Sequence, residues 1–387
     1  MFKVGYNLTI AGWSVNSADD PRTELSEIET VLSLDSPADA CRIAVYAPPP
    51  SQPGLLEQLA GAAIDAAAGA LGFGEKTAEA AFSLQVRGQD VKPGDPITIE
   101  LTAGDVSGKV MTAEVQAVQA AFDLTTITGR TGMQKLADTR LNQVYENQSL
   151  SQIVKDLAGQ AGVQAGEIET GNTYAYFVVH ESKNLLRHLR ELALREGMDL
   201  YFDADNRLVI KKFSKTSPDH TFYYGIDILD LRFSHHRPGS EHILVFGESP
   251  ASNQGTATWH WLVKDITPFR SEIGQGPQAL PLQDSVVRTK DAADTFAAAK
   301  LGAIKDQAAT GRLKLLGNPK VKVGDAVEIK NAPKPELNGL FKVTSVRHRF
   351  NKREGYLTFV GFSGQGGAAA ASGLLGALSG LAGGLGL

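Results

Sequence analysis

Cysteine is almost absent from this chain of 387 residues, in which Cys41 is the single example. One thiol excludes an internal disulfide and any zinc site built from cysteine pairs, and it is compatible with a reducing compartment. The first fifteen residues, MFKVGYNLTIAGWSV, contain one lysine and no sustained apolar core. We therefore expect no secretory signal.

Neither sign of charge is in large excess, since 38 Lys and Arg residues stand against 43 Asp and Glu residues, for a net charge of −5. This balance lacks the positive field of a nucleic-acid-binding protein. One basic stretch, residues 342–353, could contact a nucleic acid inside a tube, but its alternating charges are better explained by an exposed hairpin. We expect no stable nucleic-acid binding.

Short motifs of common enzymes are also missing. The sequence has no GxSxG, P-loop or HExxH pattern, and the run GQGPQ at Gly274 indicates a loop rather than a phosphate cradle. A catalytic pair of carboxylates leaves no such pattern, so hydrolysis is not excluded. No catalytic residue or cofactor is predicted.

Two groups of histidines need an interpretation. A metal site would need His235, His236 and His242 to converge, whereas neighbours on a strand point to opposite faces, which favours surface or interface positions. His180 and Glu181 could form an acid–base pair. Because they precede a predicted helix cap, packing at a strand end is the preferred interpretation, and no metal is predicted.

What the chain does contain is a repeat. The block VKPGDPITIE at residues 91–100 returns as VKVGDAVEIK at residues 321–330. Its Gly-Asp pair indicates a tight turn, and the alternation that follows indicates a strand with one buried face. The spacing is too long for a solenoid period, so the sequence predicts one β module used twice.

The repeat assigns specific positions. We expect the two turn glycines to share a conformation that glycine tolerates best, and the two aspartates to cap the turns through their side chains. A further glycine follows each block at similar spacing and opens a second β-rich run. The turn residues are Gly94, Asp95, Gly324 and Asp325, and the later glycines are Gly108 and Gly339.

The length allows two or three domains, and the patterning predicts an α+β, mainly β fold: two related β modules, which the family resemblance given below implies are β-barrels, with an inserted α+β domain. The predicted parts are a first module at 1–130 with an apolar helical insert at 48–80, an inserted domain at 131–213, a second module at 214–362 with a connecting helix at 290–307, and a Gly/Ala/Leu-rich tail at 363–387.

Capping signals place two helices in the inserted domain. Ser149 and Gln152 form a capping-box pattern before an apolar stripe. A second helix is predicted to be capped at Ser182 and to end at Gly197. A strand pair then turns at Asp205-Asn206.

Two apolar additions stand outside this pattern. Helices rich in glycine and alanine are marginal alone, so residues 55–72 and the charge-free tail each need a partner surface. A transmembrane span is the alternative for the tail, although nine glycines and six leucines make it weakly hydrophobic. The apolar positions predicted to contact a partner are Leu55, Leu59, Leu71, Leu374, Leu378, Leu381 and Leu385.

Three segments together resemble the phage late control protein D family, the hub proteins of contractile tails, which are similar to the N-terminal part of VgrG proteins. They are YAYFVVHESKNLLRHLRELALREGMDLYFDADNRLVI at 174–210, GNPKVKVGDAVEIKN at 317–331 and GLFKVTSVRHRFNKREGYLTFVGF at 339–362. The family's usual Asp-Phe after the cap is Asn184-Leu185 here. With the helix after Ser149, the resemblance covers most of residues 85–362.

The resemblance implies a structural role at the baseplate of a contractile tail or injection system. It implies a homotrimer whose six similar barrels adapt a hexameric inner tube above to a trimeric spike below. The spike is expected to be a separate chain, with a tape-measure protein and baseplate wedge proteins as further candidate partners. Assembly is expected in the bacterial cytoplasm, with the two apolar additions near the threefold axis and no membrane contact except by insertion of the tail.

The alternative function is a cell-wall-degrading or effector-bearing tail enzyme, in which an addition or the middle domain carries activity. The absence of a catalytic constellation favours the structural hub.

Overall fold

The computed structural model describes residues 3–17, 25–34, 39–46, 84–86, 89–121, 124–247 and 270–364. The predicted apolar insert at 48–80, nearly all of the tail and their seven leucines, Leu55, Leu59, Leu71, Leu374, Leu378, Leu381 and Leu385, lie outside the described residues. Thirteen strands form one large sheet, which makes the chain mainly β as predicted.

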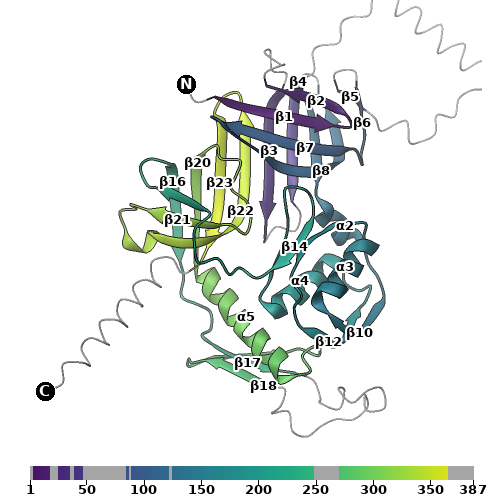
Figure 1. The fold of residues 1–387 in the computed structure, drawn as a ribbon, viewed down its shortest axis with the longest axis vertical. Helices are drawn as coiled ribbons and strands as arrows, with labels where there is room; N and C mark the ends of the chain where they lie inside the picture. Colours follow the sequence, from purple (N-terminus) through teal and green to yellow (C-terminus); the bar gives the residue numbers. More distant parts are fainter. Residues whose placement is uncertain are drawn as a thin grey trace, which may run out of the picture.

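The large sheet contains both copies of the repeat (Figure 1). Most of its neighbours are antiparallel, and the order is β16-β20-β23-β22-β3-β4-β9-β8-β7-β1-β2, with β21 between β22 and the short β15. Its first half comprises β1 (Val4–Ile10), β2 (Trp13–Asn16), β3 (Leu25–Ser33), β4 (Ala40–Tyr46), β7 (Pro96–Ala103), β8 (Val106–Ala120) and β9 (Leu124–Arg130). Its second half comprises β15 (His220–Tyr223), β16 (Ile228–His235), β20 (Ala309–Leu316), β21 (Ala326–Lys330), β22 (Gly339–Asn351) and β23 (Gly355–Ser363).

The two halves are joined by the antiparallel pair β3 and β22, whose register runs from Ser345 opposite Ser33 to Asn351 opposite Glu27. Two ion pairs lie across this junction. Arg349 Nε is 2.7 Å from Glu27 Oε1, and Arg347 Nε is 2.7 Å from Glu29 Oε1. The copies are therefore halves of one continuous sheet.

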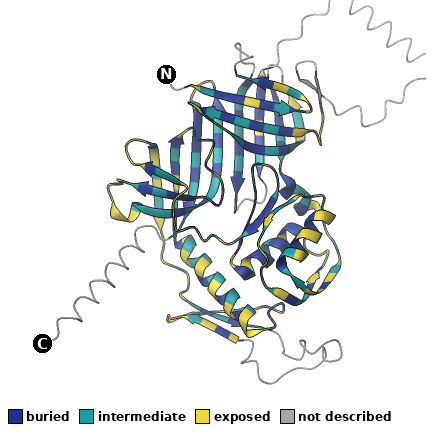
Figure 2. Cartoon of the chain, viewed as in Figure 1, coloured by how far each residue is buried: buried dark blue, intermediate teal, exposed yellow. Residues whose placement is uncertain are grey.

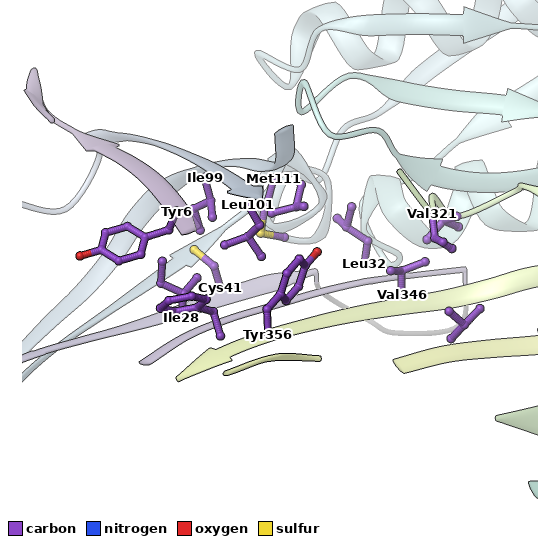
Figure 3. Close-up of a cluster of buried hydrophobic side chains, with 14 of the residues drawn as sticks. Tyr6, Ile28, Leu32, Cys41, Ile99, Leu101, Met111, Val321, Val346 and Tyr356 are labelled. Atoms are coloured by element: carbon purple, nitrogen blue, oxygen red, sulfur yellow. The ribbon is translucent and has the colours of Figure 1, made fainter. Parts of the chain in front are cut away.

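Alternation of apolar and polar residues explains why these segments are strands with one buried face. In β7 every second residue is buried, and Ile97, Ile99 and Leu101 are fully covered (Figure 2). The sheet curls so that β1, β7 and β8 face strands from both halves. Tyr6 of β1 packs edge-on against Phe350 of β22, and Figure 3 shows Tyr356 of β23 pointing toward Leu101 of β7 and Met111 of β8. One core thus serves both copies of the repeat.

The inserted domain has a separate core made by its helices and short strands. Ser149 caps α3 with the predicted capping box, in which its hydroxyl accepts from the Gln152 backbone and the Gln152 side chain accepts in return. The predicted cap at Ser182 is wrong, because Asn184 caps α4 by accepting from the Arg187 backbone. The elements are α2 (Gly132–Asp138), β10 (Gln143–Ser149), α3 (Leu150–Gln160), β11 (Ala165–Ile168), β12 (Thr173–Val179), α4 (Leu185–Glu196), β13 (Asp199–Phe202) and β14 (Leu208–Lys211).

A third, smaller unit leaves the sheet between β16 and β20. Three short strands carry α5 on one face around a core that includes Ile243, Val245 and Phe296. The ion pair of Arg195 Nε with Asp284 Oδ2, 2.6 Å apart, ties this unit to α4. Its elements are β17 (His242–Phe246), β18 (Arg270–Gly274), β19 (Ala279–Gln283) and α5 (Lys290–Ala308). The remaining described elements are β5 (Leu84–Val86), β6 (Gln89–Val91) and the short helix η5 (Pro335–Leu337).

Candidate functional site

The two repeated Gly-Asp turns have the same local geometry. Gly94 and Gly324 both adopt the left-handed backbone conformation, with φ of 94° and 81°. The side chain of Asp95 accepts the Lys92 N–H at 2.8 Å, and that of Asp325 accepts the backbone N–H three residues earlier at 2.9 Å. Each carboxylate thus closes its own turn, which is the usual role of aspartate in such turns.

Each turn is also bonded to the long strand of its own half. In the first half, the Gly94 N–H donates to Val115 O at 2.8 Å, and the Val115 N–H donates to Asp95 O at 2.8 Å. In the second half, Gly324 and Asp325 make the same two bonds with Val343, at 3.0 and 2.8 Å.

A β-bulge follows the valine in both long strands, and the repeat therefore extends well beyond the ten matched residues.

The later glycines do not share a position. Gly339 is the first residue of β22 and pairs with Ile329 of β21. Counted from the two turns, Ile329 corresponds to Ile99, which pairs with Met111. Gly108 lies three residues earlier in β8, where an added Cβ would be 3.2 Å from the carbonyl oxygen of Pro319.

The surroundings of the two turns differ. A Cβ added to Gly94 would meet nothing within 4 Å, whereas one added to Gly324 would lie 2.9 Å from the hydroxyl of Tyr201 on β13. Asp325 also accepts from His220 Nε2 at 3.1 Å and from Lys215 Nζ at 3.2 Å. Tyr201 of the inserted domain therefore packs against the second turn but not the first, and burial raises the pKa of its phenol.

The β13–β14 hairpin reaches the first half of the sheet at its other end. Lys109 Nζ of β8 lies 2.7 Å from Asp205 Oδ1 at the hairpin turn, and this hydrogen bond lowers the pKa of Asp205. Asn206 Oδ1 accepts the Gly132 N–H at 2.7 Å. Lys342 of β22 completes the attachment through Asp199, 3.0 Å away. The hairpin is thus clamped between both copies of the module.

A pocket of about 320 Å³ remains between the hairpin and the sheet, with Lys109, Tyr201 and Gly324 in its lining. His348 lines its floor and is 3% exposed. The Nδ1 atom of His348 lies 2.8 Å from the Tyr356 hydroxyl and 3.2 Å from the Thr358 hydroxyl. Burial lowers the pKa of His348 to about 3, so the ring is neutral near pH 7.

The other candidate residues lie apart from this site. His180 bonds the Ser182 hydroxyl through Nδ1 at 2.6 Å and packs edge-on against His188. His242 Nε2 lies 2.8 Å from Glu272 on β18, and His235 ends β16. Among the described residues, no three His, Cys, Asp or Glu side chains gather as a metal ion would require. No described helix is long and apolar enough to cross a membrane.

Sequence reasoning found the turns but missed the residues that clamp the hairpin. Tyr201 and Lys342 lie within the segments that carry the family resemblance, but no local pattern marks them or Lys109 as contacts, because their partners come from other segments of the chain. The predicted Asp205-Asn206 turn was the one available signal, since both residues prove to be contact points.

We predict that replacing each turn glycine with alanine distinguishes the cost of backbone strain in the turn from the cost of displacing Tyr201. Gly94→Ala should lower the free energy of unfolding by about 1–2 kcal/mol through backbone strain alone. Gly324→Ala should lower it by about 1–3 kcal/mol more, because its Cβ also displaces Tyr201. Urea unfolding of the two variants measures this difference in free energy. Adding Tyr201→Phe should recover part of the lost stability in Gly324→Ala but none in Gly94→Ala. Equal losses at the two sites would show that Tyr201 does not matter.

We also predict that His348 makes stability fall with acid. The unfolded histidine takes up a proton near pH 6.5 while the folded one stays neutral until about pH 3, so stability contributed by His348 is complete above pH 6.5 and is lost below it. Between pH 7 and 5 the loss should be about 2 kcal/mol. Buried Asp39, with its pKa raised by burial to about 7, acts in the opposite direction. The measurement is therefore the stability difference between wild type and His348→Gln at each pH, and a constant difference would contradict the prediction.

Neither a protein-family model nor a curated protein sequence matches this chain. Solved structures do match it. The 43 kDa tail protein of prophage MuSo2 from Shewanella oneidensis has a TM-score of 0.65 at 13% identity, covering 93% of this chain and 98% of that protein. A tail protein from Neisseria meningitidis has a TM-score of 0.63 at 12% identity, covering 93% and 96%.

A third match is an Escherichia coli component of the type VI secretion system that is described as similar to the bacteriophage T4 tail proteins gp27 and gp5. Its TM-score is 0.53 at 10% identity, and the match covers 92% of this chain and 76% of that protein. The chain therefore shares its fold, along almost its whole length, with these phage tail proteins and with this type VI secretion component, as the resemblance in its sequence predicts.

Proposed function

We propose that this chain is the structural hub of the baseplate of a contractile tail or injection system, acting as a homotrimer between a hexameric inner tube and a trimeric spike. The observation that carries the proposal is the duplicated module within one chain, with the same turn bonds and the same bulge in each half. The whole-length match to tail proteins supports the same role.

The duplication suits a change of symmetry. A tube with six subunits needs six similar docking surfaces, and three chains that each carry two modules supply them. The opposite side of the same ring would keep true threefold symmetry, because the inserted domain and the unit around α5 each occur once among the described residues of a chain. The tube would bind the repeated modules, and the spike would bind the threefold side. A tape-measure protein and wedge proteins are further proposed partners, and assembly is proposed to take place in the bacterial cytoplasm.

The proposed role needs no catalysis. Three ion pairs join separate segments of the chain near the hairpin: Lys109 with Asp205, Lys342 with Asp199, and Lys215 with Asp325. These pairs fix one domain against another, and the removal of either partner would loosen the joint rather than stop a reaction. The hub would therefore work by surface complementarity.

We predict that the purified protein has three times the mass of the 41.2 kDa chain in light scattering and binds the inner tube protein of its own particle. Purified protein should not lyse peptidoglycan. A monomer that does not bind the tube protein would refute the proposed hub function. Lysis that a single Asp or Glu substitution abolishes would instead support the enzyme.

We further propose that the apolar positions in the two additions, from Leu55 to Leu71 and from Leu374 to Leu385, lie near the threefold axis and contact the spike or tape-measure protein. Gly364 still belongs to the sheet, since its N–H donates to Ala309 O at 3.0 Å. Deletion of residues 365–387 should therefore leave the described fold intact but impair particle assembly. A Gly/Ser segment of equal length is the matched control and should fail equally. Complete, functional particles from either variant would show that the tail is dispensable.

A further inference from the structure

The two halves of the sheet repeat the same order of strands. Outward from the long strand, the first half runs β8-β9-β4-β3 and the second runs β22-β23-β20-β16. On its other edge each long strand holds the short strand that follows a repeated turn, β7 or β21. In the second half, β16 therefore occupies the place that β3 occupies in the first.

Strand irregularities fix this correspondence residue by residue. Besides the bulges of the long strands, the two outer strands have a matching pair: the register shifts between Leu25 and Glu27 in β3, and between Ile228 and Asp230 in β16. A bulge adds one residue to one strand, so its position marks the register of that strand. Leu25 thus corresponds to Ile228, and every later residue of β3 has a defined counterpart in β16.

Beyond its bulge, the long strand of the second half has a partner on one edge, whereas the long strand of the first half has none there among the described residues. Beyond its bulge, β22 is paired on the β21 side by β3. In the first half β7 stops pairing with β8 at Glu114, so residues 117–120 have no strand on that edge within the described chain. At the far end of the sheet, β16 is paired with β20 alone among the described strands. Gln119 of β8 is exposed at the first of these edges, and Arg232 and Ser234 of β16 are exposed at the second.

We infer that the free edge of β8 pairs antiparallel with β16 of a neighbouring copy of this chain, as β22 pairs with β3 within one chain. The occupant is a second copy because the molecule already contains this joint once, between counterparts of the same two strands. Transfer of the internal register places Ala117 opposite His236, Val118 opposite His235, Gln119 opposite Ser234 and Ala120 opposite Phe233.

The joint is head-to-tail, so each copy offers one β8 edge and one β16 edge. Such contacts make a ring when the rotation closes. The closure at three copies rests on the proposed function, whereas the pairing itself rests on the strand correspondence. β8 and β16 lie on opposite sides of the molecule in Figure 1, as a ring requires. Pairing would also cover two edges that are otherwise open to aggregation.

The joint between copies differs in charge from the joint within a chain. Internally, Arg347 meets Glu29 across the seam. Their counterparts are Gln119 and Arg232, which form no ion pair of opposite charge. The joint between copies thus depends on backbone hydrogen bonds and packing rather than on ion pairs.

A disulfide tests the register. Leu34 N–H donates to Thr344 O, so by alternation the pair Arg347–Val31 is not hydrogen-bonded, and neither is its counterpart Gln119–Ser234. Such pairs have Cα atoms about 4.5 Å apart, within reach of a disulfide. Under mild oxidation, Gln119→Cys/Ser234→Cys should form covalent dimers and trimers on a non-reducing gel. The native Cys41 is 2% exposed and stays unreactive.

The matched control is Gln119→Cys/Arg232→Cys, which keeps the same face of β16 but shifts the register by two residues. Its Cα atoms would be about 7–8 Å apart, so it should cross-link about tenfold more slowly. A mixture of the two single variants, Gln119→Cys and Ser234→Cys, should give dimers only, which shows that the bond joins different chains.

The inference is overturned if the protein is a monomer, or if it forms a trimer in which the matched pair links no faster than the control. If a trimer without faster cross-linking of the matched pair still binds the tube protein, the pairing is wrong but the proposed hub function stands. Conversely, specific cross-linking of a protein that binds no tube protein would sustain the pairing and reject the hub.

Discussion

The pairing of β3 with β22 is the interaction on which the rest of the architecture depends. Arg349 and Glu27 bond across this seam although they lie 322 positions apart in the chain. Without the seam, the first and second halves would be separate sheets with separate edges. With it, the apolar faces of both halves pack into one core, and the β13–β14 hairpin finds a surface made of both modules.

The duplication has kept the backbone and changed the surroundings. Both Gly-Asp turns make the same hydrogen bonds to their long strands, which explains why glycine and aspartate occur at both. Tyr201 contacts the second turn alone, and Lys109 receives the hairpin tip in the first half. One module thus supports the insert through its turn and the other through the start of its long strand. The two halves are similar but the inserted domain is single, so each half contacts it through a different part of the module.

Local patterns in the sequence were enough to predict the repeated turns, the cap at Ser149 and the helix α5, because each depends on neighbours along the chain. The cap of α4 was misplaced because Ser182 and Asn184 are equally good capping residues. The choice between them is tertiary, since the Leu185 N–H donates to Thr139 O of another segment. The seam of β3 with β22, the contact of Tyr201 with Gly324 and the small unit around α5 were likewise invisible, because residues distant in sequence create them.

The charged pairs across the β3–β22 seam have a consequence for synthesis on the ribosome. β3 is made early. β8 emerges long before β22, and the free edge of β8 corresponds to the edge of β22 that pairs with β3. A nascent β3 could therefore pair with the wrong long strand. Arg347 and Arg349 attract Glu29 and Glu27, whereas β8 and the residue after it present Gln119 and Ala121 at those positions. Charge complementarity is a recognised means of rejecting incorrect partners. In this chain the two ion pairs favour pairing of β3 with β22, which is made late, over pairing with β8, which is made early.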